Sequence, residues 1–391
     1  MNHQRRFWLI MLMLTLPSLL GALAMDMLLP ALPDMAVSLQ LTAGQIQWML
    51  NIFILGFAFC QLLVGLGATR FSDHQLFLLA IVLFILSSAA IAFMTSYTGI
   101  LVLRFMQALA SCTTLVISMS LITQSFSASQ VTKGHSILSG ITSLGPLLAP
   151  LVGVAILNTG ANWRGIFFML ALTGCLILIL FFRVNPLFYW RTQPAPRQYY
   201  GKIARSPQFW RYAIFSSAGM SWIFLFFSTS PFIVHTVYLQ DKWALALLFS
   251  IASGCFMIGS YMGAVSRQKE PSGLLLEYCL IAQIALSAFL ATLTVFYELP
   301  FYGFVTWIMM MQVNCGLYFG PAISAALQTF PDIPVQAAAF QGFQQFSITF
   351  LIAGLLLFFF RHEIYDLSVM VLIVSFLAIS AVSIVKIKYG V

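Results

Sequence analysis

Long apolar stretches separated by short polar segments run along most of this 391-residue chain. Each stretch approaches the roughly 20 residues that a helix needs to cross a bilayer, and lipid requires backbone polar groups to be satisfied within the segment. The pattern predicts twelve membrane-spanning helices, at about residues 7–29, 45–68, 76–94, 99–123, 136–157, 165–182, 210–233, 243–265, 274–296, 301–327, 336–360 and 367–385.

One long polar segment, residues 183–209, contains four prolines and lies in the middle of the chain. It leaves six predicted helices on each side, the layout of a secondary transporter built from two bundles. We therefore predict an all-α integral membrane protein with an N-terminal six-helix bundle at residues 1–183, a cytoplasmic linker at 184–209 and a C-terminal six-helix bundle at 210–391.

Basic residues concentrate on one side of this predicted topology. With the N-terminus inside, fourteen lie in cytoplasmic segments, whereas only Arg164, Lys242 and Arg361 lie outside. Cytoplasmic loops carry such an excess of Lys and Arg, so both termini are expected in the cytoplasm. A cleavable signal peptide ending near Ala24 is the alternative. It would remove one helix and invert the charge pattern, so a retained first helix is favoured.

Composition supports a membrane protein and argues against several other classes. The chain is 61% hydrophobic and 7% charged, whereas soluble domains carry about 25% charged residues. The net charge of +8 follows the topology and does not indicate nucleic-acid binding. The six cysteines lie in apolar stretches and the five histidines stand singly, so neither disulfides nor metal sites are predicted. The chain shows no GxSxG and no phosphate-binding glycine loop, and we expect neither an enzyme nor a cofactor.

Three ionisable residues inside predicted spans need an explanation, because a charge at mid-membrane is costly. Asp26 and Arg104 lie at similar depth in the outer half of the first and fourth helices, which both line the cavity in bundles of this plan. We interpret Asp26 as an acid that gains and loses a proton, with Arg104 as its partner. The alternatives are that Asp26 only caps a turn in the headgroup region and that Arg104 only anchors packing. Glu277 lies near a helix end, and its side chain is expected to reach the interface.

Polar residues follow Arg104 at spacings of three and four, which places Gln107, Ser111, Thr114 and Ser118 on one helix face. Such a face either joins helices or lines water. With Arg104 and Gln107 at its head, we favour a water-lined cavity.

Aromatic residues with a few polar side chains among them favour a large apolar cavity for an amphipathic organic compound, although aromatic stripes usually face lipid or core. The predicted cavity residues are Asn51, Gln107, Ser111, Trp222, Trp307, Asn314 and Tyr318.

The fifth predicted helix is interrupted by Gly145-Pro146 and Pro150. These residues predict a kink and close packing on another helix, and gating is a further possibility left open. Gly259 and Gly263 of the eighth helix are a candidate for the opposing surface.

Several motifs together resemble a known family. "MDMLLPALPDMA" (residues 25–36), "LRFMQALAS" (103–111), "GPLLAPLVG" (145–153), "ANWRGIFF" (161–168) and "STSPFIV" (228–234) occur in order. They resemble drug–proton antiporters of the major facilitator superfamily, of the bicyclomycin/chloramphenicol-resistance type.

The resemblance implies a monomeric exporter in the bacterial inner membrane, driven by the proton gradient, that carries a drug or a natural product such as a siderophore. It makes Asp26 the proton-carrying acid and Arg104 its coupling partner. An uptake permease for a related compound and a non-transporting membrane protein remain alternatives. One segment departs from the family pattern, since residues 65–75 read "GLGATRFSDHQ" where an acid and a basic pair are usual. A local pair of Arg70 with Asp73 is a candidate replacement.

Overall fold

The computed structural model describes residues 3–67, 71–126, 128–184, 200–269, 274–330, 332–361 and 363–389. The regular elements in this part of the chain are helices. Eleven of them are long and apolar enough to cross a membrane, and α13 adds a further long helix of 28 residues. The predicted fold class, a multi-pass all-α membrane protein with twelve spanning helices, is confirmed.

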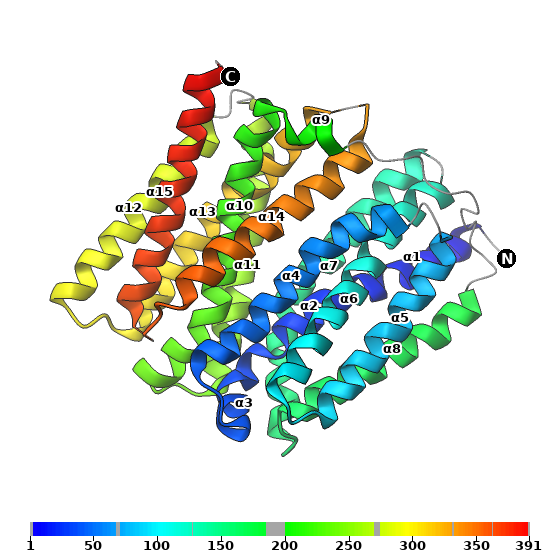
Figure 1. The fold of residues 1–391 in the computed structure, drawn as a ribbon, viewed down its shortest axis with the longest axis horizontal. Helices are drawn as coiled ribbons and strands as arrows, with labels where there is room; N and C mark the ends of the chain where they lie inside the picture. The colour runs from blue at the N-terminus through cyan, green and yellow to red at the C-terminus, as the bar shows by residue number, and fades with distance from the viewer. Residues whose placement is uncertain are drawn as a thin grey trace. The chain divides into compact units, whose positions relative to one another are not determined.

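Two compact units make up the fold (Figure 1). The first comprises Met1–Leu41 and Leu55–Gln198, and the second comprises Thr42–Ile54 and Tyr199–Val391. The main division lies within the segment that the sequence marks as a linker. One difference from the predicted bundles is that the first half of α4 groups with the second unit.

The helices of the first unit pack on one another, with α5 against α6 and α8, α6 against α1, and α7 against α2. Its elements are α1 (His3–Ser18), α2 (Leu20–Asp26), η1 (Leu29–Ala31), α3 (Leu32–Leu39), α4 (Ala43–Gly67, shared), α5 (Asp73–Phe93), α6 (Tyr97–Ser125), α7 (Ala128–Asn158) and α8 (Trp163–Val184).

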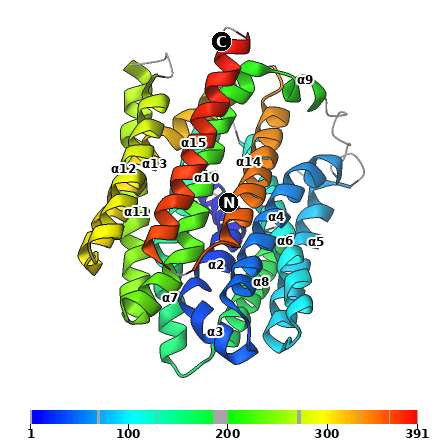
Figure 2. The ribbon, with the colours of Figure 1, turned by 60° about the vertical axis from the view of Figure 1, so that its left-hand side comes forward.

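The second unit has α10 in contact with α13, α14 and α15, while α15 also packs along α12 (Figure 2). Its elements are α9 (Tyr200–Ala204), α10 (Pro207–Phe232), the π-helix η3 (Ile233–Val237), α11 (Lys242–Lys269), α12 (Leu274–Phe296), α13 (Phe301–Gln328), α14 (Pro334–Leu357) and α15 (Ile364–Tyr389).

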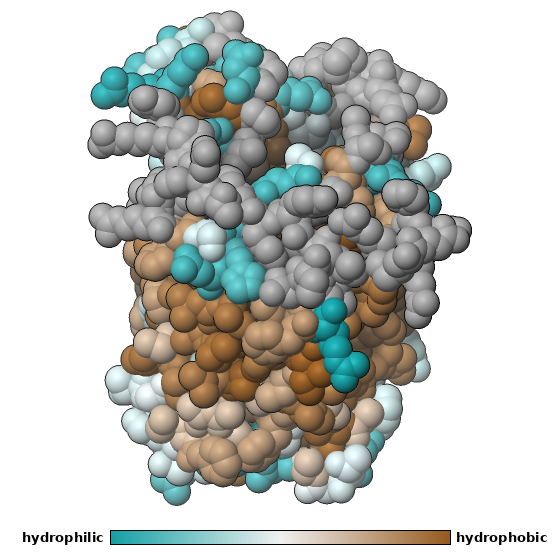
Figure 3. All heavy atoms as spheres, turned by 90° about the vertical axis from the view of Figure 1, so that its right-hand side faces the viewer, coloured by the Kyte–Doolittle hydropathy of each residue, from teal (hydrophilic) through white to brown (hydrophobic). Residues whose placement is uncertain are grey.

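Apolar side chains on the outer faces of the helices identify the lipid-facing surface. On α5, Leu79, Leu86 and Phe93 recur every seven residues and are exposed, Phe93 to 74%, while Phe77 and Phe84 are fully buried. A seven-residue repeat keeps side chains on one helix face. Soluble monomeric proteins rarely expose an apolar surface of this extent. Figure 3 shows it as a broad apolar belt, with polar residues gathered at its lower edge.

The first span does not end where the sequence suggested. The chain continues through η1 and α3, so that the helical segment extends from Phe7 to Leu39. Pro30 cannot donate to the carbonyl of the residue four before it, which is Asp26, and α2 accordingly ends there. The prolines therefore interrupt the helical segment without ending it.

The segment that departs from the family pattern forms a helix start. The Ser72 hydroxyl accepts a hydrogen bond from the Gln75 backbone nitrogen at 3.2 Å, and the Ser72 nitrogen donates to Gln75 Oε1 at 3.1 Å. This is a capping box for α5. Asp73 accepts a hydrogen bond from Gln124 Nε2 at 3.1 Å. The candidate pair of Arg70 with Asp73 lies outside the described residues.

A short helix in the predicted linker, α9, belongs to the second unit and packs on its α10 and α14. Tyr200 of α9 stacks on Phe340, with ring centroids 6.2 Å apart, and Ile203 joins an apolar cluster with Phe209 and Phe340. Trp210 Nε1 donates to the Ala204 carbonyl at 2.8 Å. These contacts hold α9 against the beginning of α10.

Glycines bring α11 and α13 into backbone contact. A Cβ at Gly259 or Gly263 would overlap the carbonyl oxygens of Val313 and Leu317, and a Cβ at Gly316 would overlap that of Phe256. The two glycines of α11 therefore allow close backbone contact with α13. Their predicted pairing with the proline-containing fifth helix is wrong.

Candidate functional site

Asp26 is the last residue of α2, and its side chain is only 3% exposed. No hydrogen bond or ion pair joins its carboxylate to another residue in the described part of the chain. A buried carboxyl group without a partner is costly in a membrane protein and generally has a functional reason.

The neighbouring helix α7 approaches α2 closely on both sides of Asp26. A Cβ at Gly145 would lie 2.6 Å from the Ala22 Cβ, and one at Gly153 would overlap the Met27 carbonyl. Residues four apart share a helix face, so Asp26 lies on the same side as Ala22, toward α7. The predicted Gly145, Pro146 and Pro150 thus belong to the helix that packs against α2 on the Asp26 side, and both prolines lie inside a continuous α7.

Arg104 of α6 is completely buried. Its Nη1 donates to the Ala24 carbonyl at 2.9 Å and to Gln107 Oε1 at 2.8 Å. Gln107 in turn donates to the Ser88 hydroxyl of α5 at 2.8 Å. Arg104 therefore joins α6 to the helix that carries Asp26, through a backbone carbonyl two residues before the acid.

Several residues on the polar face of α6 make hydrogen bonds that join this helix to its neighbours. Thr114 Oγ1 donates to the Pro17 carbonyl of α1 at 2.9 Å, and the Ser111 hydroxyl donates to its own helix at Ala108. All five residues of the face, including Ser118, are buried. Gln107 contacts Arg104 within α6 and Ser88 of α5, and Ser111 bonds within α6; the place of both residues in a water-lined cavity stays a prediction.

Three predicted cavity residues of α13 bind the neighbouring helix α12. Trp307 Nε1 donates to the Leu286 carbonyl at 3.1 Å, Asn314 Nδ2 to the Cys279 carbonyl at 2.9 Å, and Tyr318 OH to Gln283 Oε1 at 2.8 Å. The face was predicted correctly, but its polar groups hold two helices together.

Trp222 of α10 differs from these three. It is fully buried, stacks on Phe226 and meets Trp307 edge to face, with centroids 5.8 and 5.4 Å away. Its Nε1 has no hydrogen-bond partner among the described residues. Of the predicted aromatic residues, Trp222 therefore retains a buried donor that a ligand could satisfy.

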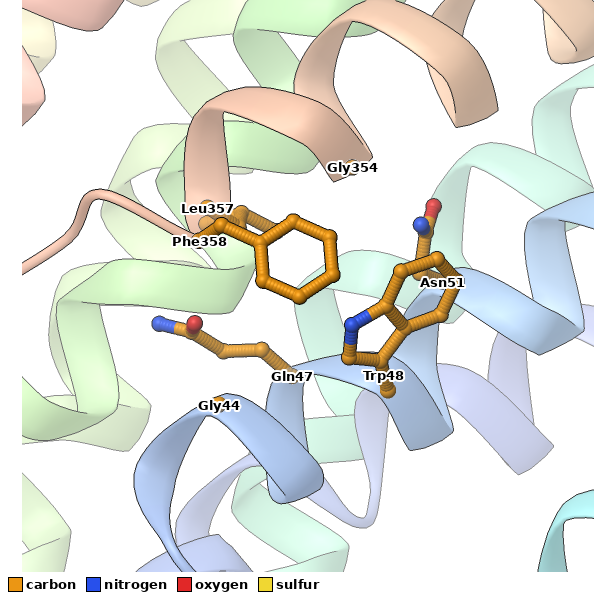
Figure 4. A pocket seen from close by; sticks show the side chains of 7 residues that line it. All are labelled: Gly44, Gln47, Trp48, Asn51, Gly354, Leu357 and Phe358. Atoms are coloured by element: carbon orange, nitrogen blue, oxygen red, sulfur yellow. The ribbon is translucent and has the colours of Figure 1, made fainter.

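Asn51 lies in the part of α4 that groups with the second unit, where it faces α14. Its Nδ2 is 3.5 Å from the Phe350 carbonyl, and Gly354 lies so close that a Cβ there would overlap the Asn51 amide. Trp48 and Phe358 meet edge to face above a cavity of about 10 Å³ (Figure 4). This space holds roughly one water, so Asn51 packs closely against α14 here, and its place in a substrate cavity stays a prediction.

Two polar clusters of the second unit were not predicted. Glu277 pairs with Arg211 of α10 at 3.5 Å and with Lys386 of α15 at 2.5 Å, whereas the sequence suggested a single side chain reaching the interface. The second cluster joins α10 to α14 through Gln341 to Ser216 at 2.6 Å and Ser217 to Gln344 at 3.0 Å. Adjacent serines in α10 and glutamines in α14 were the available signal.

All six cysteines are free thiols. Nowhere in the described ranges do three or more His, Cys, Asp or Glu side chains gather in a way that could hold a metal ion.

Comparison with known proteins places this helical arrangement in a family. Residues 14–350 match the family model described as Major Facilitator Superfamily. An uncharacterised MFS-type transporter of Bacillus subtilis, YdgK, is 27% identical over 80% of this chain and 79% of its own length. A bicyclomycin resistance protein homolog of Haemophilus influenzae is 24% identical over 91% and 90%, and a chloramphenicol resistance protein of Pseudomonas aeruginosa is 26% identical over 81% and 75%.

Solved structures agree on the fold. A POT family transporter in complex with 5-aminolevulinic acid superposes with a TM-score of 0.77 at 12% identity, covering 99% of this chain and 96% of its own. A D-xylose-proton symporter gives a TM-score of 0.70 at 15% identity, covering 95% and 97%. At these identities the likeness concerns the fold alone. From the family match over most of its length, the chain belongs to the major facilitator superfamily and is a multi-pass membrane transporter.

Proposed function

We propose that this transporter exports an amphipathic small organic compound, a drug or a natural product such as a siderophore, in exchange for protons. The observation that carries the proposal is Asp26, a buried carboxylate with no partner among the described residues, on a helix held by Arg104 and covered by α7. The relatives named for bicyclomycin and chloramphenicol resistance support export of compounds of this kind.

In the proposed cycle Asp26 binds a proton in one access state and releases it in the other. Loss or gain of a proton changes the charge of the Asp26 carboxyl group and therefore the free-energy cost of burying this group. That difference in free energy can favour one access state over the other. Arg104 acts as a positioning residue, because its contact is with the backbone of α2 and not with the carboxylate.

Trp222 is the substrate contact that we propose in the second unit. Its rings provide apolar area, and its Nε1 provides a donor that no described residue satisfies. A compound with one acceptor in an aromatic body fits such a surface, since pockets for small molecules combine apolar walls with a few polar groups.

We further propose a monomer in the bacterial inner membrane with both termini in the cytoplasm. The bacterial relatives support the compartment. The excess of Lys and Arg in segments on one side supports the orientation.

Proteoliposomes with an imposed pH gradient test the coupling, with chloramphenicol as the first probe. Asp26→Asn is expected to abolish accumulation against the substrate gradient while substrate exchange at equal pH persists, because binding and alternation need no net proton movement. The matched control is Asp34→Asn, a second acid of the same segment in α3. Unchanged uphill transport by Asp26→Asn would remove Asp26 from the coupling role, and accumulation in the opposite direction would indicate an uptake permease.

A further inference from the structure

The second unit contains a large open cavity that the transport cycle above does not use. Its volume is about 950 Å³. It is bounded by the residues after α10, the connection between α12 and α13, and the residues before and at the start of α15. In Figure 1 these segments lie at the end of the unit opposite to the C-terminus.

Aromatic side chains form much of the wall. They are Tyr238, Phe296, Tyr297, Phe301 and Tyr365. Tyr238 is held in place, because its hydroxyl donates to the Leu299 carbonyl at 3.0 Å and its ring lies 5.2 Å from that of Phe301. The wall therefore has at least one ring in a fixed position.

Two carboxylates, Glu298 and Glu363, belong to the same lining, which includes no Lys or Arg among its described residues. This local negative charge contrasts with a chain whose formal net charge is +8. Aromatic faces attract cations through the ring quadrupole, and nearby carboxylates add Coulomb attraction. The combination selects against anions and favours an organic cation.

Much of the cavity lies beyond the spanning segments. The span of α12 ends at Phe296 and that of α15 begins at Ile364, so both glutamates belong to connections outside the spans. An aromatic belt at the membrane surface would account for exposed Tyr and Phe. It would not account for two carboxylates within one hollow of ligand size.

We propose that this aromatic–acidic cavity, lined by Tyr238, Phe296, Tyr297, Glu298, Phe301, Glu363 and Tyr365, binds a soluble amphipathic organic cation. The cationic head lies between the two glutamates and against the rings. The apolar part of the ligand covers the remaining aromatic surface.

Calorimetric titration of the purified full-length protein in detergent tests this site. The probe is 3-hydroxyphenyltrimethylammonium, and its neutral counterpart is 3-tert-butylphenol, in which carbon replaces nitrogen. We expect the cation to bind at least tenfold more tightly than the neutral compound. Glu298→Gln with Glu363→Gln should weaken it at least tenfold, and Tyr365→Leu by roughly threefold or more.

The matched control is Asp241→Asn, which removes one carboxylate outside the lining. Asp241 Oδ1 accepts from the Ala244 nitrogen at 2.8 Å at the start of α11, a role that Asn also fills. This variant should bind the cation within twofold of the parent. Melting temperatures of all variants establish that they are folded, and the two single glutamine variants replace the double one if it is not.

Three results would overturn the proposal. They are unchanged affinity in the double variant, equal binding of the neutral compound, and cation binding that is present in phosphatidylglycerol nanodiscs but abolished when phosphatidylethanolamine is added. The last would identify the occupant as a lipid headgroup. Binding in Asp26→Asn should equal that of the parent, so failure of this site and failure of the proton-coupling proposal are told apart.

Discussion

Arg104 and Ala24 are joined by a hydrogen bond of 2.9 Å from the guanidinium Nη1 to the backbone carbonyl oxygen, which ties α6 to α2. The contact positions the helix that ends at Asp26 without using the acid itself. This contact gives Arg104 a structural role at the site.

Replacing Arg104 by glutamine should lower the stability of the first unit. The shorter side chain loses the Ala24 contact, and interhelical hydrogen bonds in membranes contribute roughly 0.6–2 kcal/mol each. The measurement is the thermal unfolding midpoint in detergent. The control is Arg164→Gln, since Arg164 also donates to a backbone carbonyl, that of Met94 at 3.3 Å, but from the start of α8. Equal midpoints for the two variants would contradict the assigned role.

A methyl group at Gly153 should separate α7 from α2. Its Cβ would overlap the Met27 carbonyl, whereas a Cβ at Gly140 of the same helix meets nothing within 4 Å. Gly153→Ala is expected to cost about 1–3 kcal/mol through overpacking. Gly140→Ala should be neutral or slightly stabilising, because alanine is the better helix former. A Gly153→Ala protein with the parent's unfolding midpoint and transport rate would show that the close approach is dispensable.

Tyr318 and Gln283 should behave as a coupled pair in stability. Their side chains share a hydrogen bond of 2.8 Å between α13 and α12. A double-mutant cycle of Tyr318→Phe and Gln283→Leu is expected to give a coupling energy of about 0.6–1.7 kcal/mol. The substrate range should not change, because these atoms are already satisfied. Tyr302→Phe, at a residue that is 82% exposed, is the neutral reference. An altered substrate range, together with no coupling energy between Tyr318 and Gln283, would indicate that Tyr318 lines the substrate cavity.

Tyr200 should make the protein less stable in alkaline solution. Burial against α14 raises the pKa of its phenol from 10.0 to about 12. Between these values the unfolded chain has lost the proton and the folded protein keeps it, so folded protein binds more protons and its stability falls as pH rises. Stability from this residue is complete below pH 10 and is lost toward pH 12.

Unfolding midpoints at pH 9 and pH 11 measure this loss. Tyr200→Phe should reduce the alkaline decrease, and it should cost little at pH 9 because the buried hydroxyl has no partner among the described residues. The exposed Tyr302→Phe variant should keep the parent's decrease. An identical pH dependence in Tyr200→Phe would refute the assignment.

Helix number and helix faces followed from the sequence, because hydrophobic length and period report directly on lipid contact. The ends of the helices were predicted less accurately. α7 begins at Ala128, well before the predicted residue 136, since its first turns are polar and carry no hydropathy signal. The first span continues to Leu39 because Pro30 and Pro33 lie where short helices begin, a place that tolerates proline.

The partner of a polar face could not be predicted in the same way. Spacing places Trp307, Asn314 and Tyr318 on one side of α13. It does not predict that their hydrogen-bond acceptors lie on α12, at Leu286, Cys279 and Gln283. A polar stripe at a helix–helix contact and one at a cavity have the same period. Only the position of the next helix separates them.

The charge cluster of Glu277 has a consequence for how the protein is made. Its two cations come from α10 and from Lys386 near the end of α15, so the cluster is complete only after the last helix has entered the membrane. Until then Glu277 of α12 has Arg211 alone. A chain shortened before Lys386 would carry this incomplete cluster permanently.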